Sequence, residues 1–238
     1  MLIQEFPKDS GPIYLETVDG RFPIEPFNTY SNLIFLAIII YWGFKVYKNP
    51  KQHLFLAAMI PVIAISYVGG TIYHATRSHE FWLRLDWMPI MFMVAALVFY
   101  FVFKLASQWW KRLIFIIALL GASFLLRILP LPPTLRISLG YAISAGTILV
   151  PILLYLKKTD WKNIHLIALA FGIFGVAIAF RVIDKSQTLF PMGTHWLWHF
   201  FGGIAVHFLI AYIFKDNLLN LSANTDVKHD PDHKGALS

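Results

Sequence analysis

The sequence contains no cysteine and few charged side chains. Without cysteine the chain has no disulfide, no thiolate metal ligand and no cysteine nucleophile, so any metal must be bound by histidine and carboxylate groups. Only 14% of the 238 residues are charged, while 58% are hydrophobic and the mean hydropathy is +0.62. This composition lies outside the range of ordinary soluble domains and predicts a membrane protein.

The chain also lacks an extended basic stripe. Its net charge of +7 comes from lysines and arginines that form short clusters between apolar runs, with no stacking motif beside them. Nucleic-acid binding is therefore not expected. We interpret the positive charge as a signal of membrane topology.

Apolar runs long enough to cross a hydrocarbon core recur along the chain. They predict an all-α, polytopic membrane protein built as a bundle of seven transmembrane helices, in a membrane domain over residues 1–216. Arg127 interrupts the fourth run, where its side chain could reach the far interface. Residues 217–238 are polar and are expected to form a disordered tail. The expected spans are 26–44, 52–76, 87–103, 111–131, 137–156, 162–182 and 194–214.

The distribution of basic residues predicts the orientation in the membrane. One set of alternate loops carries compact clusters nearly free of acids, such as 45–51 and 157–162, whereas the other set mixes basic residues with Asp and Glu. Cytoplasmic loops carry the excess of Lys and Arg, so we expect the N-terminus outside and the C-terminus inside. The missing cysteines, and a single glycosylation sequon at Asn220 on the predicted inner side, favour a bacterial cytoplasmic membrane.

Four ionisable residues are predicted to meet at one membrane face. His74 closes the second span and Asp86 opens the third, while His195 and His199 open the seventh. The number of crossings between them places all four on the same side, whichever way the protein is oriented. Ionisable groups at membrane depth are costly, which makes this cluster the candidate functional site.

The spacing within the cluster indicates metal binding. His195 and His199 are four residues apart in HWLWH, so on a helix both imidazoles point to one side, about 6 Å apart, and can share a metal. His74 could supply the third ligand. Three neutral imidazoles with an open fourth position are the ligand set of a catalytic zinc. The motif lacks the Glu of HExxH enzymes, and Asp86 is the nearest candidate for a general base.

Other interpretations of these histidines stay open. A lone histidine at the end of a span is more often an interfacial hydrogen-bonding residue than a ligand, and Trp196 and Trp198 are ordinary interfacial anchors. A haem-binding electron carrier and a receptor or transporter with a structural zinc are the alternative classes of protein. A retinal protein is disfavoured, because the seventh span has no lysine before Lys215.

The remaining histidines are not expected to join the site. His207 lies twelve residues beyond His195, about 18 Å along a helix, and is expected to be buried and hydrogen-bonded. His79 is expected to be solvated in the same outer loop as the cluster. His53 and His165 begin spans on the opposite face.

Four segments resemble the alkaline ceramidase family, which belongs to a superfamily of seven-helix membrane hydrolases that includes progestin/adiponectin-type receptors and Per1-type lipid remodelling proteins. They occur in order along almost the whole chain. These segments are EPFNTYSN at 25–32, GGTIYHAT at 69–76, LDWMP at 85–89, and the stretch from Arg181 and Asp184 to HWLWH.

The resemblance implies a zinc amidase that hydrolyses the N-acyl bond of ceramide or a related lipid within the bilayer. It implies His74, His195 and His199 as zinc ligands and Asp86 as the acid/base. Members of the family have a serine four residues before the first histidine, where it helps to stabilise the oxyanion. This chain has Gly70 there, and Thr71, one residue later, is expected to substitute for it.

The resemblance also suggests a second metal. In the family, acidic residues near the N-terminus and the glutamate that opens the EPFNT-like sequence together hold calcium, an ion that takes six or more oxygen ligands. Glu25 matches that glutamate, and Glu16 and Asp19 are the nearby carboxylates. Capping of a helix N-terminus is the alternative role for Glu25, as it is for Asn28 and Ser31.

Two further functions fit the same cluster. One is an ester-cleaving lipid remodelling hydrolase, and the other is a non-catalytic, zinc-containing, receptor-like membrane protein. The sequence makes no prediction of the oligomeric state.

Overall fold

The structure is a computed structural model that describes residues 6–128, 133–186 and 190–229. In these ranges the secondary structure is helical, with no strand. The all-α prediction is therefore confirmed for the described residues. The helices are α1 (Pro26–Ser31), α2 (Leu33–Val46), α3 (Leu54–Thr76), α4 (Glu80–Leu105), α5 (Trp109–Arg127), α6 (Pro133–Lys158), α7 (Ile164–Ile183) and α8 (His195–His229).

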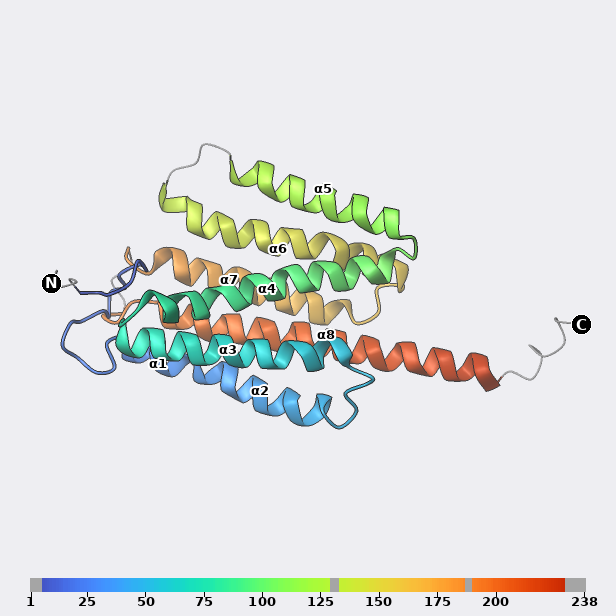
Figure 1. Cartoon of the computed structure of the whole chain (residues 1–238), viewed down its shortest axis with the longest axis horizontal. Coiled ribbons are helices and arrows are strands. Elements are labelled where there is room, and N and C mark those ends of the chain that lie inside the picture. Colours follow the sequence, from blue (N-terminus) through green and yellow to red (C-terminus); the bar gives the residue numbers. More distant parts are fainter. Residues whose placement is uncertain (1–5, 129–132, 187–189, 230–238) are drawn as a thin grey trace, which may run out of the picture.

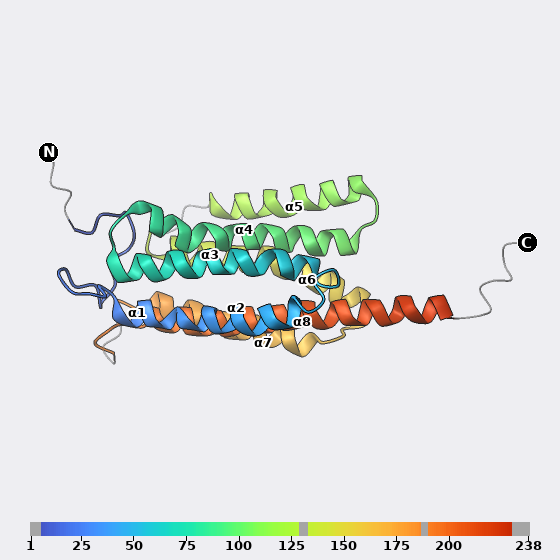
Figure 2. The same ribbon diagram turned by 60° about the horizontal axis from the view of Figure 1, so that its bottom comes forward.

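The helices lie side by side along one long axis (Figures 1 and 2). The helical assignment breaks between α1 and α2 at Asn32, but its backbone stays in the α region, so the two helices together make one rod. α7 packs along α8 and α3 packs along α4, while α5 lies at the edge beside α6. The N-terminal segment, the start of α1, the end of α3 and the start of α8 all meet at one end of the bundle.

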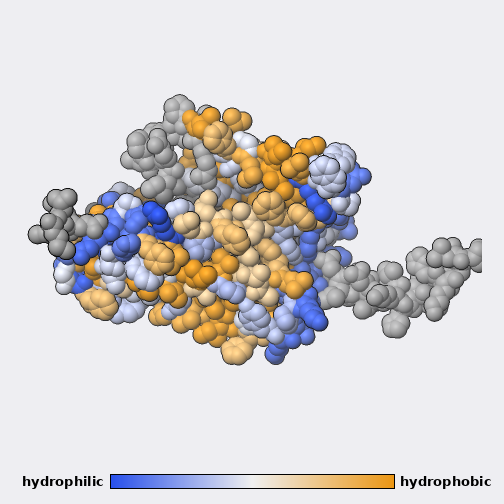
Figure 3. Space-filling model, in the orientation of Figure 1, coloured by the Kyte–Doolittle hydropathy of each residue, from blue (hydrophilic) through white to orange (hydrophobic). Residues whose placement is uncertain are grey.

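Within the described part of the chain, five helical rods are long and apolar enough to cross a membrane, so the chain is a multi-pass membrane protein. Apolar side chains cover the middle of the molecule and hydrophilic ones gather toward its two ends (Figure 3). Among the described residues α5 and α6 are not counted as spans, so the prediction of seven is not confirmed. The five rods are 26–46, 54–76, 80–105, 164–183 and 195–219.

The structure differs most from the predicted boundaries at the start of α4 and at the end of α8. α4 begins at Glu80 rather than at residue 87, because the Nδ1 atom of His79 accepts a hydrogen bond from the backbone N–H of Phe81, at 3.0 Å, and caps the helix. Asp86 therefore lies in the second turn of α4. α8 continues to His229, so residues 217–229 are helical where a disordered tail was predicted. Extending an existing helix needs no new nucleus, which allows a polar segment to follow an apolar span.

Glycines bring the helices close together near the site. The backbone of Gly69 on α3 lies against Leu85 on α4, where an added Cβ would be 2.4 Å from the Leu85 Cβ. On α8, a Cβ added to Gly203 would lie 2.7 Å from the side chain of Ile34 on α2. This close packing holds α3 and α8, the two helices that carry the histidines, in one compact bundle.

Candidate metal centre

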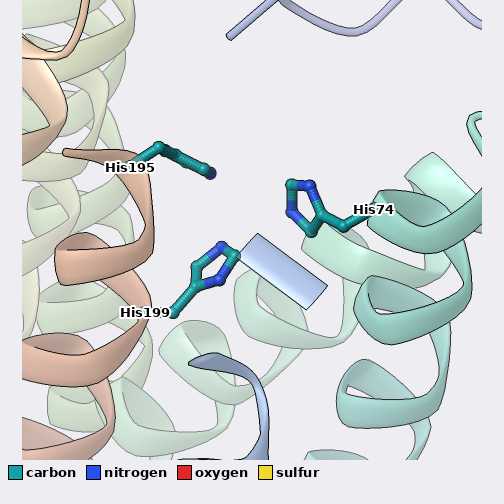
Figure 4. Close-up of side chains that lie close together, drawn as sticks. All are labelled: His74, His195 and His199. Atoms are coloured by element: carbon teal, nitrogen blue, oxygen red, sulfur yellow. The ribbon is translucent and has the colours of Figure 1, made fainter. Parts of the chain in front are cut away.

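His74, His195 and His199 meet at one end of the bundle, as their positions in the sequence predict. His74 comes from the last turn of α3, and the other two come from the first turns of α8 (Figure 4). Their rings point toward a common space, and one potential ligand nitrogen from each lies within 4.8 Å of the others. All three side chains are buried. A tetrahedral zinc with bonds of about 2.0–2.1 Å needs nitrogens about 3.3 Å apart, a distance reachable by small rotations of the rings.

His74 is prepared to donate a lone pair to a metal. Its Nδ1 lies 2.5 Å from Oε2 of Glu25, so the Nδ1–H donates to the carboxylate and Nε2 carries the lone pair. Nε2 is buried and has no hydrogen-bond partner. A carboxylate behind a histidine is the usual support of a metal ligand, and a buried nitrogen without a partner is costly unless something binds it. This histidine therefore fits a metal site.

Two residues of α1 hold His199 in the same tautomer as His74, with the proton on Nδ1. Its Nδ1 lies 3.1 Å from the carbonyl oxygen of Asn28 and 2.9 Å from Oγ of Ser31. Because a carbonyl only accepts, Nδ1 carries the proton and Nε2 is left as the ligand atom. Sequence reasoning offered helix capping for Asn28 and Ser31, but the structure places them behind the second histidine of the HWLWH motif.

His195 is positioned by its backbone and by two neighbouring side chains. Oδ1 of Asp184 accepts hydrogen bonds from the backbone N–H groups of Thr194, at 2.6 Å, and His195, at 2.8 Å, which caps the start of α8. The ring of Tyr14 stacks on the His195 ring with centroids 3.9 Å apart. Nη1 of Arg181 lies 3.3 Å from Nδ1 of His195. The sequence alone predicted no role for Tyr14. It placed Asp184 only in the segment that runs from Arg181 to the HWLWH motif.

Asp86 lies beside the histidines but is not one of the grouped ligands. Its carboxylate contacts the backbone of Gly70, one helical turn before His74, where an added Cβ would lie 2.4 Å from Oδ1. Its electrostatic partners include His74 and Arg181. Thr71, on the same turn of α3, has a buried hydroxyl with no hydrogen-bond partner. Both predicted catalytic side chains therefore lie in the turns of α3 and α4 next to the cluster.

The three carboxylates suggested for calcium do not converge on one point. Glu25, Glu16 and Asp19 form no metal-binding group among the residues that the structure describes. Both Glu16 oxygens accept backbone N–H groups, from Phe27 at 2.8 Å and Asn28 at 2.6 Å, and so cap α1. Asp19 is exposed and accepts from the backbone N–H of Gly20. The residues present do not fit a calcium ion.

Glu25 instead joins His74 to Arg77. Its Oε2 accepts from His74, and its Oε1 accepts from the guanidinium of Arg77 at 2.6 Å and from the hydroxyl of Thr17 at 2.6 Å. Burial by itself raises the pKa of the Glu25 carboxyl, but these three partners outweigh burial, and its pKa lies below the usual range. Burial likewise lowers the pKa of Arg77, but Asp9, Tyr73 and Glu25 raise it, with a net increase. The pair is therefore charged.

Four other histidines lie apart from the cluster; His207 is hydrogen-bonded as predicted but only half-buried. His207 accepts a hydrogen bond from Nε1 of Trp42, at 3.2 Å, in the middle of the bundle. His53 lies at the opposite end, stacked on Phe214. His165 is exposed at that end. His79, expected to be solvated, is exposed and also caps α4.

Comparison with known proteins adds no assignment. No protein-family model matches the chain, and no curated protein matches it.

Proposed function

We propose that this protein is a membrane-embedded, zinc-dependent hydrolase that cleaves the N-acyl amide bond of ceramide or a related lipid. The observation that carries the proposal is the buried triad of His74, His195 and His199, with a carboxylate behind His74 and an unpartnered Nε2 on the same ring. Zinc bound by three histidines would polarise the acyl carbonyl and lower the pKa of a water molecule.

The lipid class is supported by an apolar cavity between α3, α4, α6, α7 and α8. Its volume is about 170 Å³, and it is lined almost wholly by apolar side chains. Measured along the helices, it begins at Ile90 about 6 Å from Asp86 and at Ala205 about 9 Å from His199, and it reaches Ile213 about 21 Å from His199. An acyl chain that occupies one leaflet is about 15 Å long, half of the hydrocarbon core. The cavity therefore lies where an acyl chain would extend from a carbonyl held at the histidines.

The protein side chains then have separate tasks. Asp86 is next to the cluster and takes a proton from the attacking water, then returns it to the leaving amine. Glu25 keeps the proton of His74 on Nδ1 and so keeps Nε2 available. Thr71, whose buried hydroxyl lacks a partner, donates to the developing oxyanion. The apolar walls keep other water away from the reacting bond.

Metal analysis coupled to a lipid panel tests the proposal. The purified protein is expected to contain about one zinc and to release fatty acid from ceramide-type amides, and His195→Ala is expected to lose both, because two histidines hold zinc far less tightly than three. The matched control is His165→Ala, which removes an exposed histidine at the opposite end. Full activity in zinc-free protein would refute the proposal. Cleavage of ester lipids alone would point to the remodelling activity, and a zinc-loaded protein that cleaves neither would point to a receptor-like role.

The orientation is part of the same proposal. We place the N-terminal segment and the histidine end of the bundle outside and the C-terminus in the cytoplasm of a bacterial cell, on the basis of the basic clusters in alternate loops. A reporter fused after α8 that is active only in the cytoplasm should be active. A reporter active only outside the cytoplasm should be silent at the same position, and the reverse pattern would invert the topology.

A further inference from the structure

Arg77 is buried at the histidine end of the bundle. It follows the last residue of α3 with a left-handed backbone (φ 43°), and it is the largest of the fully buried side chains in the described residues. A charged arginine is almost never fully buried unless it is paired.

The Arg77 guanidinium is surrounded by oxygen atoms from two segments. Its Nε and Nη2 donate to the two carboxylate oxygens of Asp9, at 2.9 and 2.6 Å, and its Nη1 donates to Oε1 of Glu25 at 2.6 Å. The carbonyl oxygens of Pro12 and Gly11 lie 3.1 and 3.3 Å from its terminal nitrogens. Five oxygens, two carboxylates among them, thus share one positive charge.

The same oxygens would otherwise need another cation. The side chains of Asp9 and Glu25 are fully buried in their ion pairs with Arg77, and buried carboxylates without a counter-charge are strongly unfavourable. Carboxylate and carbonyl oxygens are also the ligands that calcium prefers. With Arg77 present, those oxygens are already satisfied.

We propose that Arg77 is a built-in cation that clamps the N-terminal segment over the metal centre and makes the centre independent of calcium. The clamp runs from Asp9 through Arg77 to Glu25 and from there to Nδ1 of His74. Arg77 is thus a positioning residue that acts on a ligand through Glu25. The inference rests on the proposed metal site, but its first consequence, the docking of the N-terminal segment, does not need a metal.

The clamp also fixes the ring that covers the site. Tyr14 is two residues beyond Pro12, whose carbonyl accepts from Arg77, and its ring stacks on His195. Releasing the guanidinium should free residues 9–14 from the bundle. That release would expose the cluster to water and loosen His195 together with His74.

Two readouts test the clamp in the full-length protein. The first is protease cleavage within residues 6–24 of metal-free protein, and the second is zinc affinity measured by competition with a coloured chelator. Arg77→Ala is expected to speed the cleavage and to weaken zinc binding about 10–100-fold, the usual effect of losing the support of a metal ligand. Millimolar guanidinium ion should restore both properties. Arg77→Lys, which keeps one charge but loses the fork of donors, should lie between.

The response to added calcium distinguishes a site filled by Arg77 from a site that binds a calcium ion. Calcium should leave the zinc affinity and melting temperature of the wild type unchanged. It should raise both in Arg77→Ala, where the five oxygens lose the guanidinium and its positive charge. The matched control is Arg84→Ala, since Arg84 is largely exposed and forms a long ion pair with Glu80, at 3.5 Å. An equal response to calcium in wild type and Arg77→Ala, or unchanged cleavage in Arg77→Ala, would overturn the clamp. A wild type that binds no zinc yet shows the cleavage pattern would overturn the proposed function and leave the clamp standing.

Discussion

Adding a side chain to either of two adjacent glycines should affect different properties: hydrolysis at Gly70 and stability at Gly69. A Cβ at Gly70 would lie 2.4 Å from Oδ1 of Asp86, the end of a side chain that can rotate. A Cβ at Gly69 would lie 2.4 Å from the Cβ of Leu85 and 2.6 Å from its backbone carbon, which cannot rotate away. Ordinary contacts begin at 3.4 Å, so each substitution demands a shift of 1.0 Å. The first shift moves a functional group, and the second moves a helix.

The size of each effect depends on whether the Asp86 side chain or the α4 backbone has to move. In Gly70→Ser we expect Asp86 to turn aside, at a cost to stability of about 0.5–1.5 kcal/mol, while a misplacement of about 1 Å lowers the hydrolysis rate on the order of 100-fold. Zinc content should not change, because Asp86 is not a ligand. In Gly69→Ala, overpacking against α4 should cost about 1–3 kcal/mol of stability.

The assays are melting of detergent-solubilised protein, zinc analysis and initial rates on a ceramide-type amide. Gly43→Ala is the control, because no atom lies within 4 Å of the added Cβ, and alanine in a helix is favoured over glycine by about 0.5–1 kcal/mol. Full hydrolysis in Gly70→Ser would refute the placement of Asp86 as the proton carrier. Wild-type melting in Gly69→Ala would refute the close packing of α3 on α4.

Two further substitutions test the supports of the site. Glu16→Ala removes both acceptors from the start of α1 and should lower stability by about 1–2 kcal/mol in thermal or denaturant unfolding, whereas Asp19→Ala, at an exposed carboxylate, should have no effect. Asp184→Ala leaves the backbone N–H groups of Thr194 and His195 without their acceptor and should weaken zinc binding in chelator competition. Asp184→Asn, which keeps an oxygen, should lose less zinc affinity. Equal losses of zinc affinity in the two variants would contradict the capping role.

The sequence by itself determined that the chain is helical and crosses a membrane, and which residues share a face. Hydropathy is a local property, because each apolar run must satisfy its own backbone hydrogen bonds in lipid. Parity of crossings then placed His74, Asp86, His195 and His199 together without any knowledge of packing. Parity needs only the relative number of crossings, which is why the placement holds even though α5 and α6 are not counted as spans.

Only the tertiary structure decided how the site is supported. Asp9 and Arg77 are 68 residues apart and Ser31 and His199 are 168 apart, and no periodicity or spacing relates such pairs. Their contacts depend on the path of the N-terminal segment back over the bundle and on side-chain packing at van der Waals distance. For the same reason Glu25, a helix cap or calcium ligand by its sequence context, is in the folded protein the carboxylate between Arg77 and His74.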